Sequence, residues 1–352
     1  MAQSSIYVRP TGRFAPGVVG SEHSGPGALR VAGRGDLLFA AGELIERKDG
    51  NVSRRIVPAA ELLAGDLALP ELMAHLCRPR EPIAGLALDR PRLMGIVNVT
   101  PDSFSDGGQF LGPEAAIEHA LRLEAEGADI IDVGAESTRP GSDPVSLDEE
   151  LRRTMPVLEG LASRLRVPLS VDTRKAEVMR RAAGAGARLL NDVSALAHDP
   201  RALEVAGETG LPVVLMHAQG DPRTMQVDPR YDDVVLDVYD WLAARIEACE
   251  RAGIPRARLV VDPGIGFGKT LAHNLALIGA SSIFHGLGCA ILLGASRKSF
   301  IARLAPGAGG DRLGGSIAAA LAGAAQGVQI LRVHDVAATH QALAVWEASL
   351  TG

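Results

Sequence analysis

Polar residues that can bind a ligand recur directly after short apolar runs along most of the chain. The set is Asn98, Asp132, Asp172, Asn191, His217, Asp262, Lys298, Arg332 and His334. Carboxylates in this set can accept paired hydrogen bonds from the edge of a flat nitrogen heterocycle, and a lysine adds a cationic donor. Arg332 and His334 stand two residues apart, so on an extended strand they share one face and suit a diphosphate. The pattern predicts a site for a heterocycle and an anion.

Each of these residues also has a purely structural interpretation. An Asp or Asn after a strand often caps the following helix, which is the role we expect of Asp192. We expect a structural role for His217 as well. For Arg332 and His334, the alternative to anion binding is an ion pair with a nearby carboxylate. Capping does not account for Lys298, because a lysine at a helix start opposes the helix dipole.

Two polar loops that contain both Gly and Pro follow the first two apolar runs. The first, residues 100–108, has two aspartates and two serines after Pro101, and the second is residues 134–141. Loops on a rigid scaffold often carry binding groups. We expect both loops to be mobile covers over the site.

A third loop, residues 263–270, is rich in glycine and follows an apolar run. It nearly matches a phosphate-binding loop, but Pro263 stands where that motif requires Gly. The alternative is that its glycines let the backbone approach a flat ligand, with Asp262 at the ligand's edge. We favour the second interpretation.

The elements that must position these residues alternate regularly from residue 92 onward. Helical segments separate eight apolar runs, at residues 93–97, 130–133, 169–171, 189–190, 213–216, 259–261, 291–293 and 330–333. Eight strands that alternate with helices over this length indicate a (β/α)8 TIM barrel, whose sites lie at the carboxyl ends of the strands. A doubly wound open sheet is the rival fold, but eight regular units favour closure.

The chain before this pattern, residues 1–90, is an N-terminal extension to which we assign no chemistry. Residues 1–35 are rich in Gly, Pro and Ser and lack periodicity, which predicts a poorly ordered start. Asp49 and Gly50 form a favoured tight turn between two strand-like runs, which predicts a β-hairpin. We expect short helical pieces and a Pro-rich linker after it, and the barrel to span residues 91–352.

The composition excludes several classes of protein. Of the 352 residues, 47% are hydrophobic and 22% are charged, which allows a large core. The net charge of −6 argues against a nucleic-acid partner. The three cysteines have no paired spacing and suit a reducing compartment. With no signal peptide or membrane span expected, we predict a cytoplasmic protein.

The motifs together resemble the dihydropteroate synthases, folate-pathway enzymes targeted by sulfonamides. The similar segments follow in order at residues 98–108, 131–141, 170–173, 191–192, 215–217, 262–269, 296–299 and 332–334. The resemblance covers about residues 92–347. Two departures are Ala135, where the family usually has Gly, and the N-terminal extension, which short members lack.

The resemblance implies the activity of a transferase. The reaction is the condensation of 6-hydroxymethyl-7,8-dihydropterin diphosphate with 4-aminobenzoate, giving 7,8-dihydropteroate and diphosphate. A dissociative, SN1-like route fits, because the aminobenzoate nitrogen is a poor nucleophile and the leaving diphosphate can be stabilised. The alternatives are a pterin-binding methyltransferase domain, which needs no diphosphate site, and a catalytically silent pterin-binding paralogue.

The resemblance also implies roles for single residues. Pterin would be bound by Asp172, Asn191, Met216, Asp262, Gly266, Phe267 and Lys298. Diphosphate would be bound by Asn98, Thr138, Arg139, Arg332 and His334, with Mg²⁺ on Asn98. Aminobenzoate would be framed by Phe104, Thr138, Pro140, Phe267 and Ser299. The catalytic residues would be Asp102, Asp172, Lys298, Arg332 and His334. Apart from these small molecules, the partner implied is a second copy in a homodimer.

Overall fold

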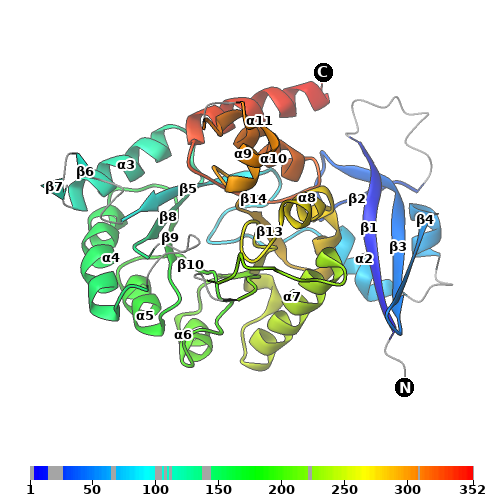
Figure 1. Cartoon of the computed structure of the whole chain (residues 1–352), viewed down its shortest axis with the longest axis horizontal. Coiled ribbons are helices and arrows are strands. Elements are labelled where there is room, and N and C mark those ends of the chain that lie inside the picture. Colours follow the sequence, from blue (N-terminus) through cyan, green and yellow to red (C-terminus); the bar gives the residue numbers. More distant parts are fainter. Residues whose placement is uncertain are drawn as a thin grey trace.

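A closed barrel of eight parallel strands forms the centre of the molecule, as predicted (Figure 1). The computed structural model describes residues 4–14, 27–64, 69–99, 105–106, 109–110, 113–136, 144–220, 224–307 and 310–351. The barrel strands are β5 (Arg92–Asn98), β8 (Ile130–Gly134), β9 (Leu169–Asp172), β10 (Leu189–Asp192), β11 (Val213–Met216), β12 (Leu259–Asp262), β13 (Ala290–Leu293) and β14 (Ile330–Val333). Pairing of β14 with β5 and of β8 with β9 closes the ring, which excludes the open sheet.

Helices surround the barrel and bury one face against it. They are α3 (Pro113–Ala125), α4 (Leu147–Ala162), α5 (Ala176–Gly184), α6 (Ala202–Thr209), α7 (Val234–Arg251), α8 (Leu271–Gly279), α9 (Ser299–Leu304), α10 (Leu313–Ala324) and α11 (Val336–Thr351), with the short 3-10 helices η1 (Arg256–Arg258) and η2 (Ser281–Leu287). In α7, Val238, Leu242 and Ile246 are buried at helical spacing. The described residues include no helix long and apolar enough to cross a membrane.

The two ends of the barrel differ in chemistry. At the amino end of the strands, Met94, Ile130 and Val260 share one apolar cluster with Ile83 and Leu88 of the preceding linker. The linker therefore closes the floor of the barrel. At the carboxyl end, four of the strands finish in a polar residue, whereas their interiors are apolar because parallel strands are buried on both faces. These last residues are Asn98, Asp172, Asp192 and Asp262.

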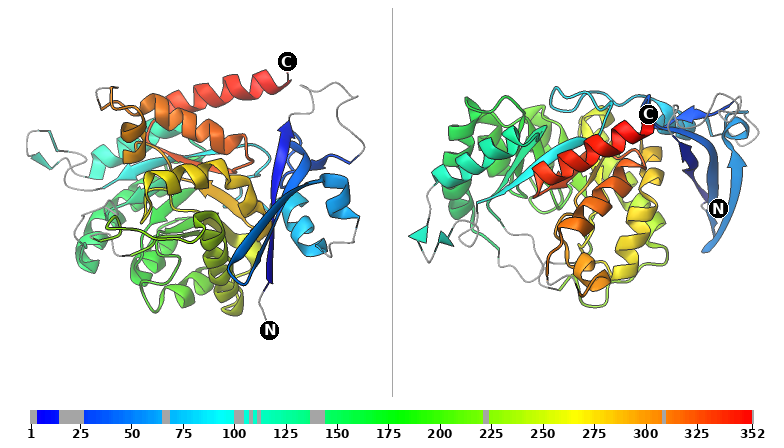
Figure 2. Two further views of the ribbon diagram at one scale, coloured as in Figure 1. Left: turned by 45° about the vertical axis from the view of Figure 1, so that its right-hand side comes forward. Right: turned by 90° about the horizontal axis from the view of Figure 1, so that it is seen from above.

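The N-terminal extension forms an antiparallel sheet beside the barrel, opposite the helices α3 and α4 (Figures 1 and 2). Its strands are β1 (Ser4–Phe14), β2 (Leu29–Arg30), β3 (Leu38–Lys48) and β4 (Asn51–Pro58), and the helices α1 (Ala59–Leu63) and α2 (Pro70–Cys77) follow. The predicted hairpin at Asp49 and Gly50 is confirmed. The predicted poorly ordered start is wrong for residues 4–14, because β1 pairs with β3 along most of its length and buries Tyr7 and Val8. Residues 1–3 and 15–26 lie outside the described residues.

A very small hairpin stands in the first polar loop. The strands β6 (Ser105–Asp106) and β7 (Gln109–Phe110) pair antiparallel. Residues 100–104 and 107–108 of that loop, and residues 137–143 in and after the second loop, lie outside the described part of the chain.

Candidate active site

The barrel brings most of the predicted site residues to its carboxyl end. Parallel register places the last residues of neighbouring strands side by side, as with Asn191 beside Asp172 and Met216 beside Asp262. In or just after the strands that end at this rim lie Asn98, Asp172, Asn191, Met216, Asp262, Gly266, Phe267, Lys298, Ser299, Arg332 and His334. The other predicted residues, which lie outside the described residues, are Asp102, Phe104, Thr138, Arg139 and Pro140.

A fully buried carboxylate, Asp132 of β8, lies at the centre of a polar cluster. Its Oδ2 atom accepts hydrogen bonds from Arg332 Nε at 2.7 Å and from Asn191 Nδ2 at 3.0 Å. Its Oδ1 atom accepts one from Ser170 Oγ at 2.6 Å. Arg332 also donates through Nη2 to Asp172 Oδ2 at 2.8 Å. Asp132 thus fixes two predicted ligand-binding residues, a role that we did not assign to it from the sequence.

The environment perturbs both of the predicted pterin-binding carboxylates. Burial raises the pKa of Asp172 to about 7, although the nearby Arg332 guanidinium opposes this rise. Burial also raises the pKa of Asp262, while Lys298 and the Gly264 amide oppose the rise. That amide donates to Asp262 Oδ1 at 2.7 Å. Buried carboxyls with such shifts are typical of binding and catalytic sites.

Lys298, the residue before α9, extends over the glycine-rich loop. Its Nζ atom donates to the Ile265 carbonyl and lies 4.6 Å from the centroid of the Phe267 ring. Burial lowers the pKa of Lys298 to about 8, and Asp262 opposes this fall. Lys298 is therefore a half-buried cation next to a carbonyl acceptor and an aromatic face, and its role at the edge of a heterocycle stays a prediction.

The glycines of residues 263–268 are required by contacts within the protein. Gly264 has φ of +68°, and a Cβ atom there would stand 1.8 Å from the His217 carbonyl oxygen. Gly268 has φ of +62°, and its Cβ would stand 2.4 Å from the Gln219 carbonyl oxygen. We had interpreted these glycines as allowing close approach of a ligand. The contacts of Gly264 and Gly268 show that the loop packs on the segment after β11. Close approach of a ligand at Gly266 stays a prediction.

Lys269 differs from the lysine of a phosphate-binding loop. Its side chain is buried, and Nζ lies 3.0 Å from both His217 Nδ1 and the Phe267 carbonyl oxygen. Burial lowers the pKa of Lys269 to about 7. Burial and the neighbouring Lys269 lower the pKa of His217 to about 3. Both side chains support the loop from behind, in agreement with the structural role expected of His217.

Arg332 and His334 do not form the open cationic pair that we expected. Arg332 forms ion pairs with Asp132 and Asp172, which is the structural alternative to anion binding given above. His334 Nδ1 lies 3.0 Å from Ser296 Oγ in the loop after β13. These contacts fix both side chains at the rim but use only part of the donor fork of the guanidinium.

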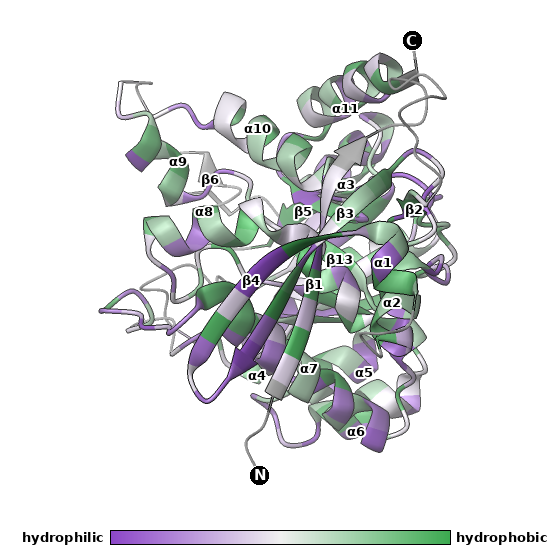
Figure 3. Cartoon of the chain, turned by 90° about the vertical axis from the view of Figure 1, so that its right-hand side faces the viewer, coloured by the Kyte–Doolittle hydropathy of each residue, from purple (hydrophilic) through white to green (hydrophobic). Residues whose placement is uncertain are grey.

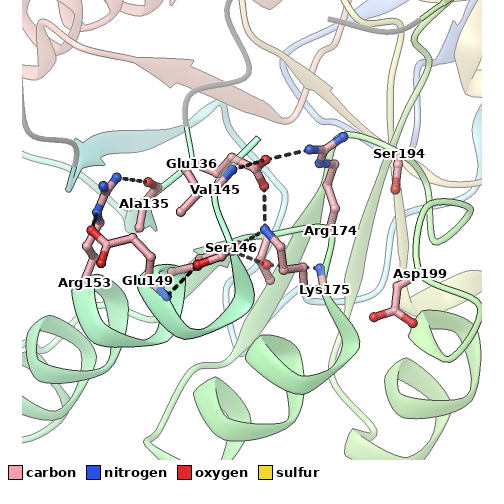
Figure 4. Close-up of polar contacts among 12 residues, drawn as sticks. Ala135, Glu136, Val145, Ser146, Glu149, Arg153, Arg174, Lys175, Ser194 and Asp199 are labelled. Atoms are coloured by element: carbon pink, nitrogen blue, oxygen red, sulfur yellow. Dashed lines mark hydrogen bonds and ion pairs between the residues drawn. The ribbon is translucent and has the colours of Figure 1, made fainter. Parts of the chain in front are cut away.

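A second ion-pair network, which we did not foresee, supports the rim beside β9 (Figure 4). Glu136 accepts hydrogen bonds from Arg174 at 2.6 Å and from Lys175 at 2.9 Å. Lys175 also contacts Glu150 of α4, which accepts from Thr173 Oγ1. Burial alone would raise the pKa of Glu136, but the two cations hold it below its usual value. The network fixes the segment that follows Asp172.

Three further predicted residues have simple positions. Asn98 is the half-buried last residue of β5, and no hydrogen-bond partner of its side-chain amide occurs among the described residues. Met216 is the buried last residue of β11, and Ser299 is the exposed first residue of α9. In the part of the chain that the structure describes, no group of three or more His, Cys, Asp or Glu side chains could hold a metal ion.

Comparisons with known proteins agree with this geometry. Residues 94–334 match the model of the family described as pterin binding enzyme. Dihydropteroate synthase of Escherichia coli strain K12 is 50% identical over 266 residues, which are 76% of this chain and 94% of that protein. A crystal structure of the Yersinia pestis dihydropteroate synthase with a sulfonamide drug has a TM-score of 0.73 and 48% identity, and covers 78% of this chain and 100% of that one. The Xanthomonas albilineans enzyme with 4-aminobenzoic acid has a TM-score of 0.73 and 52% identity, with coverage of 78% and 99%.

The fold and the rim residues therefore define a barrel enzyme of the pterin-binding class. Within that class, the chain belongs to the dihydropteroate synthase family. Its activity is that of a transferase in folate biosynthesis. The family match begins at residue 94, so the N-terminal sheet lies outside it.

Proposed function

We propose that the chain joins 6-hydroxymethyl-7,8-dihydropterin diphosphate to 4-aminobenzoate and releases 7,8-dihydropteroate and diphosphate. The observation that carries this proposal is the convergence of Asp172, Asn191, Asp262 and Lys298 on one rim of the barrel. The complex of the Xanthomonas albilineans relative with 4-aminobenzoic acid supports the choice of second substrate.

The pterin is proposed to bind between the two perturbed carboxyls. Asp262 has one oxygen on the Gly264 amide and offers the other to the N–H donors of the ring. The other polar atoms of the ring would form hydrogen bonds with Asn191, which is held by Asp132, and with the Lys298 ammonium. Met216, Gly266 and Phe267 would supply the apolar contacts to its faces.

The diphosphate is proposed to bind at Arg332 and His334. Arg332 is fixed by Asp132 and Asp172, so its unused N–H groups can donate to a phosphate oxygen without reorganisation. The half-buried Asn98 is proposed as one ligand of a Mg²⁺ ion, since Mg²⁺ takes few protein ligands and substrate phosphates. When bound, that ion would neutralise charge on the leaving group. Thr138 and Arg139 are proposed to add further contacts.

The route is proposed to be dissociative. Arg332 and His334 would stabilise the leaving diphosphate, and the pterin would delocalise the cation formed at its exocyclic carbon. Asp102 is proposed to stabilise that cation. Phe267 and Ser299, together with Phe104, Thr138 and Pro140, would hold the aminobenzoate amine in line.

Two alternative functions predict different behaviour. A pterin-binding methyltransferase domain would bind pterin without any need for Arg332 and His334 as diphosphate ligands. A silent paralogue would bind pterin but form no product. The identity with relatives named as synthases favours the synthase, which forms dihydropteroate from the two substrates.

The assay is dihydropteroate formation from the two substrates in the presence of Mg²⁺, with and without EDTA. We expect product with Mg²⁺ and a large loss after chelation. Absence of product with Mg²⁺ would reject the synthase, and full activity in EDTA would reject the metal. We further propose a cytoplasmic homodimer and a domain boundary near residue 91, where the barrel strands begin, with the linker before it packed against the barrel floor. Light scattering that gives the mass of one chain would reject the dimer.

A further inference from the structure

The hairpin of the N-terminal extension contacts the start of α7 through two arginines. Arg47 Nη1 of β3 lies 2.8 Å from Asp237 Oδ1, and Arg54 Nη2 of β4 lies 2.6 Å from Asp233 Oδ2. Figure 3 shows β4 on the outer face of the molecule, with hydrophilic residues along much of its length. The hairpin thus presents positive charge to two carboxylates of the barrel.

The same two carboxylates organise the first turn of α7 with their other oxygens. Asp233 is the N-cap of α7, and its Oδ1 atom accepts from the amides of Val235 at 3.0 Å and Leu236 at 3.2 Å. The Oδ2 atom of Asp237 accepts from the amides of Asp232 at 2.9 Å and Asp233 at 3.2 Å. Each carboxylate therefore joins the extension to the backbone at residues 232–236.

The residue just before this turn contacts the glycine-rich loop of the site. Tyr231 Oη donates a hydrogen bond to the Gly268 carbonyl at 2.8 Å. The Tyr231 ring also packs edge-on against His273, with centroids 5.0 Å apart. Gly268 is next to Phe267, whose ring lies under the Lys298 ammonium. A short series of bonded contacts thus connects the hairpin with the loop.

The attachment of the sheet to the barrel rests largely on other contacts, although Arg47 Nη1 also lies 3.5 Å from Asp240 Oδ2. Tyr7 of β1 is buried, donates to Asp240 at 2.9 Å, and packs edge-on against Tyr239 with centroids 5.1 Å apart. Ser282 of η2 donates to the Pro10 carbonyl at 3.3 Å. The Tyr7–Tyr239 and Ser282–Pro10 contacts involve neither arginine, so loss of either arginine is compatible with a folded protein.

We propose that Arg47 and Arg54 are positioning residues that set the pterin-binding loop, residues 263–268, through the start of α7 and Tyr231. This inference rests on the proposed function, in which that loop binds the pterin. It gives the N-terminal extension a role in substrate affinity. A merely structural role would affect only the stability of the protein.

The test compares Arg47→Ala, Arg54→Ala and the double variant with the wild type by steady-state kinetics. We expect the KM for the dihydropterin diphosphate to rise about fivefold in the double variant, because two partly exposed pairs act together. The kcat should stay within about twofold. Arg47→Lys should restore much of the affinity. The matched control is Arg180→Ala, which removes pairs to Glu177 and Glu208 at an arginine as exposed as Arg54. Arg180 belongs to α5, which lies on the opposite side of the barrel from the extension (Figure 1).

A double-mutant cycle tests the route of the effect. Tyr231→Phe keeps the ring and removes the hydrogen bond to Gly268. If the arginines act through this bond, Arg47→Ala should change the KM less in the Tyr231→Phe background than in the wild type. Additive effects would reject the route, and an unchanged KM with a lowered melting temperature would reject the positioning role. A wild-type protein that forms no dihydropteroate would instead reject the proposed function.

Discussion

Asp262 is the residue whose conservative replacement tests pterin recognition most directly. In Asp262→Asn, one acceptor oxygen becomes a donor while the shape is kept, so either the Gly264 amide or a ring N–H loses its partner. An unpaired buried polar group costs about 1–3 kcal/mol, which corresponds to a loss of affinity of roughly 5- to 150-fold. Calorimetry with dephosphorylated pterin measures this loss. Affinity within about twofold of the wild type would contradict the role.

Lys298 should make pterin binding depend on pH. Burial lowers its pKa from 10.5 to about 8. The charged donor is therefore present below pH 8 and is lost as the pH rises through this value. We expect pterin affinity to fall above pH 8 in the wild type. Lys298→Met should bind weakly at every pH without a break near pH 8, and a break that persists in this variant would assign the titration to another group.

The same titration of Lys298 should raise the stability of the protein while it lowers pterin affinity. Between pH 8 and 10.5, the unfolded chain binds more protons at Lys298 than the folded chain does. The contribution of this residue to the free energy of unfolding therefore rises with pH there. Affinity and stability should change in opposite directions, which separates a loss of the donor from general unfolding.

His334 is a cleaner test of diphosphate binding than Arg332. Removal of Arg332 leaves Asp132 and Asp172 buried without their cation, a change that costs about 3–5 kcal/mol for a buried pair. We expect Arg332→Ala to lower the melting temperature and to weaken pterin as well as diphosphate. His334→Ala should weaken inhibition by free diphosphate about tenfold, with little effect on dephosphorylated pterin. Equal effects of His334→Ala on both ligands would reject its assignment.

At the level of elements, the glycine-rich loop depends on its backbone contacts with the segment after β11. Gly264→Ala would place a methyl group 1.8 Å from the His217 carbonyl oxygen at a positive φ. We expect it to lower the free energy of unfolding by more than about 2 kcal/mol and to weaken pterin binding. Thermal unfolding measures the first effect. Gly279→Ala is the control, since no atom lies within 4 Å of its added Cβ.

The barrel strands were predictable because parallel strands are buried on both faces and appear as uninterrupted apolar runs, such as 259–261. The rim residues were predictable because they lie in or shortly after these apolar runs. The pairing of Arg332 with Asp132 was not predictable, because 200 residues separate them and only barrel closure brings them together. The ion pairs of Glu136 were not predictable for the same reason, since Arg174 and Lys175 lie in the loop after the next strand, β9.

At the scale of the whole molecule, the extension was the least predictable part. The turn at Asp49 and Gly50 is local and was predicted, whereas the order of β1 depends on its pairing with β3. The strand that contains Tyr7 and Val8 was not predicted from the composition of residues 1–35, because most glycines and prolines of this stretch lie after the strand. Long-range pairing of this kind leaves little local signal.

The linker that closes the barrel floor determines where this protein can be shortened. Ile83 and Leu88 are buried in the cluster at the amino end of the strands, and Arg80 donates to the Cys289 carbonyl at 2.9 Å. A chain that starts at residue 91 would lack Ile83 and Leu88 and would expose the apolar residues at the amino end of the barrel to solvent. We therefore expect it to aggregate when expressed. One that starts at residue 79 would keep this seal, so the catalytic unit for biochemical dissection is longer than the family match alone suggests.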